Sequence, residues 1–354
     1  MKKILLNIII VLLALTANAQ LGQYAVVRPD GTAFIYSSWD SAYNKAANGD
    51  NLYLPGGYVI INNPINKSLN IYGAGYNQDS SLVTGHTIIN PTNGLFEIAS
   101  GGSDGMITGV YIQSTVGIHD TVHNYTISRC YAYAITIGSG TVLPASNINI
   151  FETAVLGFVQ CIGTGSTYPT NVVMMNSVIG ALGGTSILLA NQTIWKDIIA
   201  RNCIFFGSTY CNFGCNYFLN NIAYSYFENC IIFSSSSISI GSYNTNTFKN
   251  CLFNQNTNII AGNTIFNCIY SQPIDSTLMQ AGNTFEIHNN YHLKPNSPGV
   301  HGGTDGTDIG IYGGVLPWNE GGVPRNPHIY FKQVAPQTNS SGQLQIQFKV
   351  RTEN

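Results

Sequence analysis

Charged residues are the scarcest chemical class in this chain of 354 residues. Lysine, arginine, aspartate and glutamate together make up 8% of it, whereas an ordinary globular protein carries about 25%. The formal net charge is -2 at pH 7, which gives no electrostatic reason to expect nucleic acid or an anionic membrane as a partner. The 16 acidic residues are scattered, so the clustered carboxylates that a glycosidase needs are not evident.

Long apolar runs are also missing, except at the N-terminus. Two lysines precede an apolar run over residues 4–15, and small residues at 17–19 form a cleavage site before Gln20. This order is typical of a secretory signal peptide, and the run is too short for a comfortable membrane span. We therefore expect residues 1–19 to be removed and the mature chain to hold no transmembrane segment. The predicted destination is the extracellular space or the cell surface, with the periplasm as the alternative.

Helical periodicity is nearly absent, and a repeat of another kind takes its place. One column of small residues recurs at steps of 23, 24, 26, 27, 21 and 17 residues: Cys130, Thr153, Ser177, Cys203, Cys230, Cys251 and Cys268. Asparagine directly precedes the column in its last five members, at Asn176, Asn202, Asn229, Asn250 and Asn267. A period of about 20 to 27 residues, carried by short β-branched strands, indicates a β-solenoid.

The two columns predict how each coil turns and packs. Asparagine tolerates left-handed backbone geometry, so we expect it at a sharp corner, with stacked amides forming an asparagine ladder from coil to coil. Free cysteine packs as a small hydrophobe, so the cysteines of the column are expected to be buried thiols. Cys161, Cys211 and Cys215 lie outside the column. The last two could close a small disulfide loop or supply two metal ligands.

Two stretches near the N-terminus, residues 46–58 and 68–75, resemble the opening of right-handed parallel β-helix proteins of the pectin-lyase-like group. Residues 293–314 are similar to the ends of secreted bacterial proteins of this kind. The resemblance implies an all-β fold, a right-handed parallel β-helix, and it implies little about chemistry because this fold carries many activities. Residues 52–270, at 20-odd residues per coil, predict about ten coils.

We divide the chain into a signal peptide (1–19), a parallel β-helix domain with an N-terminal cap (20–316) and a C-terminal hairpin or tail (317–354). A short helix over residues 38–47 is expected to cap the first coil. Residues 328–334 and 343–351 alternate as two strands and predict the hairpin. We expect it to close the C-terminal end of the solenoid; the alternative is an outer-membrane sorting signal.

Three charged residues, Arg201, Glu228 and Lys249, stand two positions before the column in successive coils. Stacking places them on one face at intervals of about 5 Å. One hypothesis makes Lys249 or Arg201 a catalytic base and Glu228 its partner or a cation ligand. The other is a structural ladder in which each ion pair contributes about 0 to 1 kcal/mol. The alternation of sign favours the ladder.

Aromatic and acidic residues supply two further candidate sites. The segment between Cys203 and Cys230 is a candidate sugar-binding surface, because aromatic faces stack on sugars while amides bind hydroxyl groups. The alternative is that its aromatic side chains pack against the solenoid. Its candidate ligand-binding residues are Tyr210, Phe213, Tyr217, Tyr224 and Tyr226. Asp305 and Asp308 are candidate calcium ligands, and the alternative is that they bind turn amides. We expect no other cofactor.

These observations favour an exported, non-catalytic module that binds extracellular glycans or contributes to a cell-surface structure. Its partner would be an extracellular polysaccharide or another surface component. One alternative is a polysaccharide lyase or glycoside hydrolase that acts on an acidic polysaccharide through the Arg201, Glu228 and Lys249 ladder. The other is a structural protein that recruits a partner through its terminal strands.

Overall fold

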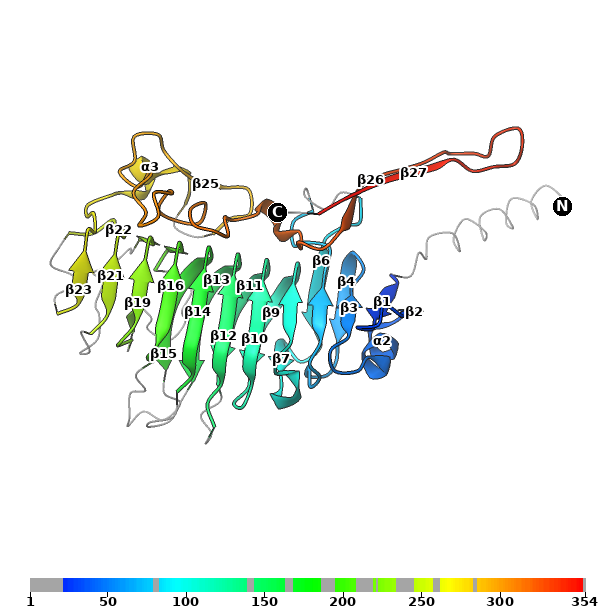
Figure 1. The fold of residues 1–354 in the computed structure, drawn as a ribbon, viewed down its shortest axis with the longest axis horizontal. Coiled ribbons are helices and arrows are strands. Elements are labelled where there is room, and N and C mark those ends of the chain that lie inside the picture. The colour runs from blue at the N-terminus through cyan, green and yellow to red at the C-terminus, as the bar shows by residue number, and fades with distance from the viewer. Residues whose placement is uncertain are drawn as a thin grey trace, which may run out of the picture.

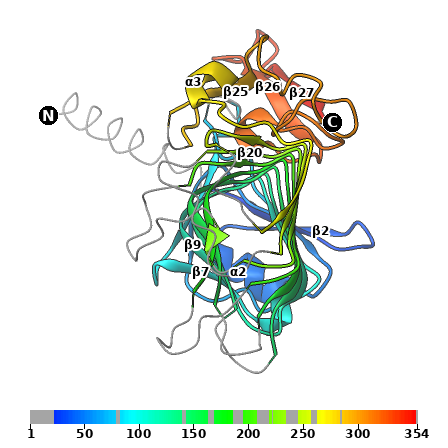
Figure 2. The same ribbon diagram turned by 90° about the vertical axis from the view of Figure 1, so that its left-hand side faces the viewer.

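The computed structural model describes residues 22–78, 83–138, 143–162, 168–185, 195–207, 219–220, 222–233, 245–256, 262–282 and 285–352. Over these residues the chain forms a parallel β-solenoid, an elongated stack of coils with a separate layer along one corner (Figures 1 and 2). The predicted all-β parallel β-helix is therefore confirmed.

Two long sheets form the walls of the solenoid. In spatial order, the first sheet contains β2 (Ala33–Tyr36), β1 (Tyr24–Val27), β3 (Asn51–Tyr53), β5 (Asn70–Tyr72), β8 (Met106–Thr108), β10 (His123–Ser128), β12 (Ser146–Phe151), β14 (Thr170–Met175), β16 (Ile198–Arg201), β19 (Tyr226–Glu228), β21 (Thr247–Lys249) and β23 (Thr264–Phe266). The second sheet contains β4 (Gly57–Ile61), β6 (Thr87–Pro91), β9 (Tyr111–Ile118), β11 (Tyr131–Ile137), β13 (Ala154–Ile162), β15 (Val178–Thr185), β17 (Ile204–Phe205), β20 (Ile231–Ile232) and β22 (Leu252–Phe253). At its side, β7 (Leu95–Ile98) pairs with β9 and β18 (Leu219–Asn220) with β15.

The solenoid makes about seven turns, fewer than the ten that we expected from a uniform coil length. Coil lengths are unequal: Ile71 pairs with Ile107, and the 36-residue step between them holds β6, β7 and the 3-10 helix η2 (Ser100–Gly102). Where the repeat is regular, equivalent residues pair in register, as do Ile127 and Ile150.

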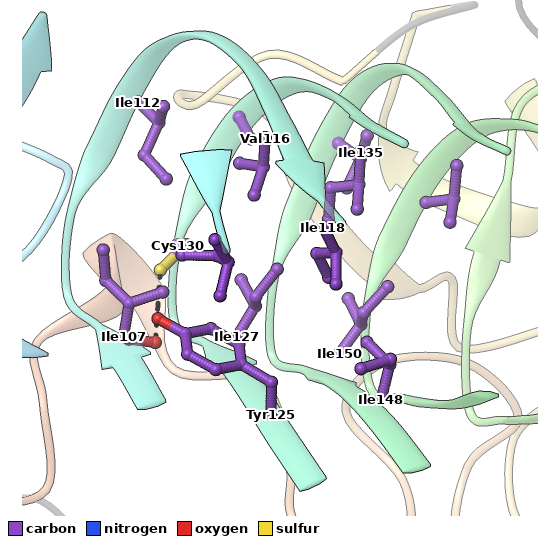
Figure 3. Packing of buried hydrophobic residues seen from close by; sticks show 14 of the residues in the cluster. Ile107, Ile112, Val116, Ile118, Tyr125, Ile127, Cys130, Ile135, Ile148 and Ile150 are labelled. Atoms are coloured by element: carbon purple, nitrogen blue, oxygen red, sulfur yellow. Dashed lines mark hydrogen bonds between the residues drawn. The ribbon is translucent and has the colours of Figure 1, made fainter. Parts of the chain in front are cut away.

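The interior of the stack is largely apolar. Cys130, Cys203, Cys230 and Cys251 are fully buried among isoleucine and phenylalanine side chains of neighbouring coils. Figure 3 shows this arrangement around Cys130, with successive isoleucines aligned from coil to coil. The described cysteines are free thiols, as predicted for the column, and Cys161 is buried in the same core. Cys211 and Cys215 lie outside the described residues.

The residue before the column turns the corner in left-handed geometry, as predicted. Its φ is +47° to +54° at Glu152, Asn176, Asn202 and Asn229. These side chains are buried polar groups at one corner of the stack. The ladder of coil-to-coil amide hydrogen bonds runs through another column, in which Asn171 Nδ2 donates to Asn147 Oδ1 (2.6 Å) and Asn147 Nδ2 donates to Asn124 Oδ1 (2.8 Å).

The predicted helix caps the first coil. It runs over α2 (Trp39–Lys45), and the Ser38 side chain accepts a hydrogen bond from the Ser41 amide at its N-terminus. Trp39 and Tyr43 are buried, and their rings stack against each other. The antiparallel strands β1 and β2 complete this end. No described helix is long and apolar enough to span a membrane.

After β23 the chain reverses direction. Residues 272–327, the return segment, contain α3 (Ile274–Thr277), β24 (Leu278–Gln280), β25 (Asn290–Leu293) and η4 (Glu320–Gly322). The segment runs back along one corner of the coils towards the N-terminal end (Figure 1). The predicted hairpin, β26 (His328–Val334) with β27 (Ile346–Arg351), therefore lies beside the first coils and extends past them. Our expectation that it closes the C-terminal end was wrong, because the return segment carries it to the opposite end.

Two sets of contacts hold the return segment in place. The residue after the column is apolar in successive coils, and Val178, Ile204 and Ile231 pack in one buried cluster with Ile311 and Trp318 of the return segment. The corner asparagines supply the polar contacts. Asn176 Nδ2 donates to the carbonyl oxygens of Ile311 (2.8 Å) and Gly313 (2.7 Å), and Asn202, Asn229 and Asn250 bond to Gly310, Thr304 and Gly302.

Candidate functional site

A groove of about 770 Å³ lies between the first coils and the base of the hairpin. Tyr53 and Gly73 line its coil side, and His328, Tyr330 and Arg351 line its hairpin side. Because β3 and β5 pair in register, Tyr53 lies directly opposite Tyr72. The two rings stack with centroids 4.9 Å apart and planes 15° from parallel. This gives the groove a half-buried aromatic wall.

A second cavity of about 320 Å³ lies beside the groove, further along the same sheet. Its floor follows the outward row of the first sheet after Tyr53, from Tyr72 through Thr108 and Ser128 to Phe151. Its far wall is the return segment, where Asn326 borders both cavities. Aromatic rings stand at the two ends of this row with hydroxyl residues between them, and the volume is in the range of ordinary ligand pockets.

A buried ion pair fixes the wall of the second cavity. Arg129 Nε contacts Glu152 Oε2 at 2.9 Å, and both side chains are almost fully buried. Arg129 Nη1 also donates to the Val323 carbonyl oxygen (2.7 Å), and Arg325 Nη2 donates to Glu152 Oε1 (3.0 Å). The return segment is thus bound to the coils by a carboxylate with two cationic partners. The sequence predicted that Arg129 and Glu152 stack. It did not predict that Arg129 bonds to Val323 in the return segment, 194 residues further along the chain.

Charged and ionisable side chains line the edges of the groove. The guanidinium of Arg351 lies 5.2 Å from the centroid of the Tyr330 ring, a favourable cation–π geometry. Tyr312 donates a hydrogen bond to Glu320, which lines the groove. Burial raises the pKa of Tyr72, and the neighbouring Tyr53 adds to the shift. The Tyr72 phenol is therefore neutral at physiological pH and is available for hydrogen bonding.

Arg201, Glu228 and Lys249 form the charge ladder that their spacing predicted. Glu228 Oε2 lies 3.1 Å from Arg201 Nε, and Glu228 Oε1 lies 3.5 Å from Lys249 Nζ. In-register pairing of β16, β19 and β21 brings the three side chains together on the outward face. Both cations are about half exposed, whereas Glu228 is mostly covered. Each cation contacts the same carboxylate, which is the arrangement of a structural ladder.

The candidate sugar-binding surface is only partly within the described residues: Tyr210, Phe213 and Tyr217 lie outside them. Tyr224 is exposed, and Lys196 Nζ lies 5.3 Å from its ring centroid. Tyr226 lies next to the ladder, where burial and then Glu228 raise its pKa. Neither tyrosine belongs to the groove, which lies near the opposite end of the first sheet.

The two candidate calcium ligands bind protein groups. Asp305 Oδ1 accepts hydrogen bonds from the Thr307 amide (3.1 Å) and hydroxyl (2.7 Å), and these bonds lower its pKa. Asp308 Oδ1 accepts from the His301 amide (2.9 Å). Across the described ranges no group of three histidine, cysteine, aspartate or glutamate side chains could hold a metal ion.

Sequence reasoning missed the groove because one wall comes from the return segment. A partial signal was present: Tyr53 and Tyr72 occupy equivalent positions in the first two coils, one residue after Leu52 and Ile71. That spacing predicts a stacked pair on the outer face, although not the segment that faces it.

Comparison of the chain with protein-family models, with curated proteins and with solved structures gave no match.

Proposed function

We propose that this protein is an exported, non-catalytic module that binds extracellular glycans through the groove beside Tyr53 and Tyr72. The observation that carries the proposal is the stacked tyrosine pair, whose two rings line two neighbouring cavities that also contain hydroxyl and amide groups. Aromatic faces and convergent polar groups are the features with which proteins recognise sugars, because sugar rings present apolar faces and hydroxyl edges. Two neighbouring cavities suit a chain of several sugar units.

Two further expectations belong to this proposal. The N-terminal pattern of residues 1–19 supports export, with the extracellular space or the cell surface as the destination. Residues 46–58 and 68–75 are similar to β-helix proteins of the pectin-lyase-like group. This similarity supports the proposal that the chain is related to that group. Cell fractionation with an antibody to the chain tests export, and recovery of uncleaved protein in the cytoplasm would contradict it.

The pairing of Glu228 with both Arg201 and Lys249 supports a non-catalytic role for the ladder. A lyase or hydrolase acting on an acidic polysaccharide remains the alternative hypothesis. It predicts release of unsaturated uronates or of new reducing ends, with the activity lost in Lys249→Ala. Turnover of this kind by the chain from Gln20 onwards would replace our proposal with the enzymatic one.

The direct test is retention on immobilised polysaccharides, with neutral and acidic members in the panel. A stacked pair of aromatic rings is worth about 0.5 to 1.5 kcal/mol beyond its buried area. If a ring stacked on a sugar contributes on the same scale, Tyr53→Ala should weaken binding about two- to tenfold. Phe266→Ala is the matched control, because Phe266 is an exposed aromatic residue of β23, at the far end of the first sheet from Tyr53. Equal effects of the two substitutions, or retention on no glycan, would refute the groove as the binding site.

A further inference from the structure

The C-terminal hairpin has a mostly apolar face whose side chains the described residues leave partly or largely exposed. All six residues of β27 are exposed, and strand alternation puts Ile346, Phe348 and Val350 on one face. Val334 pairs with Ile346 and Ile329 with Val350, which extends this face across both strands, and Lys332 pairs with Phe348 at its centre. The five side chains are 38% to 62% exposed. A two-stranded hairpin alone is marginally stable in water, so this face gains stability when a second surface covers it.

The hairpin also differs in charge from the rest of the molecule. Residues 328–352 contain three basic residues, Lys332, Lys349 and Arg351, and no acidic residue. Residues 22–327 contain nine basic and fifteen acidic residues, a formal charge of -6. The body of another copy of this chain is therefore electrostatically complementary to the hairpin, and complementary charge promotes encounter and fixes orientation.

A matching apolar surface lies at the same end of the molecule. Strand β4 ends the spatial order of the second sheet within the described residues, and its neighbour at this end is the capping helix α2. Its outward side chains Tyr58 and Ile60 are 66% and 55% exposed. The molecule's own hairpin cannot cover them, because it extends beyond this end and away from the coils (Figure 1). Neighbouring apolar side chains that are exposed in this way are typical of association surfaces.

We propose that two copies of this chain associate end to end through their N-terminal ends, each hairpin covering β4 of the other copy. Seven residues of β26 span about 23 Å at about 3.3 Å per residue, the width of about five coils at their spacing of about 4.8 Å. The hairpin is therefore long enough to cross the first coils of a partner. A twofold axis makes the two contacts identical and closes the assembly as a dimer. This inference is independent of glycan binding.

The test is sedimentation equilibrium of the chain from Gln20 over a range of concentrations and at two salt concentrations. We expect a monomer–dimer equilibrium that weakens at high salt. Phe348→Ser should raise the dissociation constant at least tenfold, since central aromatic anchors dominate interfaces. Gln347→Ser, the neighbouring residue on the opposite hairpin face, is the matched control and should change it less than twofold. Circular dichroism melts of both variants check that the solenoid is intact.

Mixing variants identifies the two surfaces. Phe348→Ser has an intact β4 and Ile60→Ser has an intact hairpin, so a heterodimer of the two retains one complete contact. We expect the mixture to dimerise more tightly than either variant alone. A wild-type monomer at all concentrations would overturn the proposal, as would a dimer unaffected by Phe348→Ser. A monomer that instead co-sediments with anionic lipid vesicles through Phe348 would overturn it in favour of a membrane partner.

Discussion

Replacing Glu152 by alanine should lower the free energy of unfolding by about 3 to 5 kcal/mol. The carboxylate lies between Arg129 Nε (2.9 Å) and Arg325 Nη2 (3.0 Å), and its side chain is 4% exposed. The Arg129 side chain is 2% exposed, so the substitution leaves a cation buried without its carboxylate. Removing one partner of a buried ion pair typically costs about 3 to 5 kcal/mol for this reason.

The chain offers a matched control in Glu228, which also contacts two cations. Arg201 and Lys249 are 48% and 41% exposed, so water can solvate both once the carboxylate is gone. Exposed ion pairs are worth about 0 to 1 kcal/mol each. Glu228→Ala should therefore cost less than about 2 kcal/mol.

Urea unfolding followed by circular dichroism measures both variants, with the stability difference taken from the midpoints at a constant slope. Arg129→Met combined with Glu152→Leu should recover much of the loss, because an apolar pair of similar volume carries no buried charge. Limited proteolysis near Pro324 should accelerate in Glu152→Ala, since the ion pair binds the return segment. Equal costs for Glu152→Ala and Glu228→Ala would refute the argument from burial.

Three further outcomes follow from the same structure. Asn176→Gly keeps the left-handed backbone but removes two buried hydrogen bonds, so urea unfolding should show a loss of about 2 to 4 kcal/mol. Asn147→Gly, in the exposed ladder, should cost less than about 1 kcal/mol in the same assay. Burial raises the pKa of Cys130 to about 12, so its thiol should resist iodoacetamide at pH 8.5 in the folded protein and react once urea unfolds it. The Cys130 thiol loses its proton near pH 9 in the unfolded chain and near pH 12 in the folded one. The free energy of unfolding should therefore fall between these pH values, by up to about 1.36 kcal/mol per pH unit. The fall should be shallower in Cys130→Ser.

Periodic features of the solenoid were predictable from the residues. Successive coils bury the same position, so the cysteine column and the left-handed corner asparagines repeat at a readable period. The charge ladder was predictable for the same reason, since in-register pairing stacks Arg201, Glu228 and Lys249. The roles of these positions were harder to predict. The asparagine amides bond to a distant segment at one corner and to each other at another.

The sequence by itself determined the repeating unit, because each coil repeats the same local choices of small, apolar and turn residues. It also determined the short capping helix, whose N-cap serine and apolar face are local. Only the tertiary structure decided where the last 80 residues lie. The contacts that hold them, such as Arg129 with Val323 and Asn176 with Ile311, join positions 135 to 194 residues apart. No local pattern specifies which coil such a segment meets, so the groove and the projecting hairpin emerge only when the chain is folded.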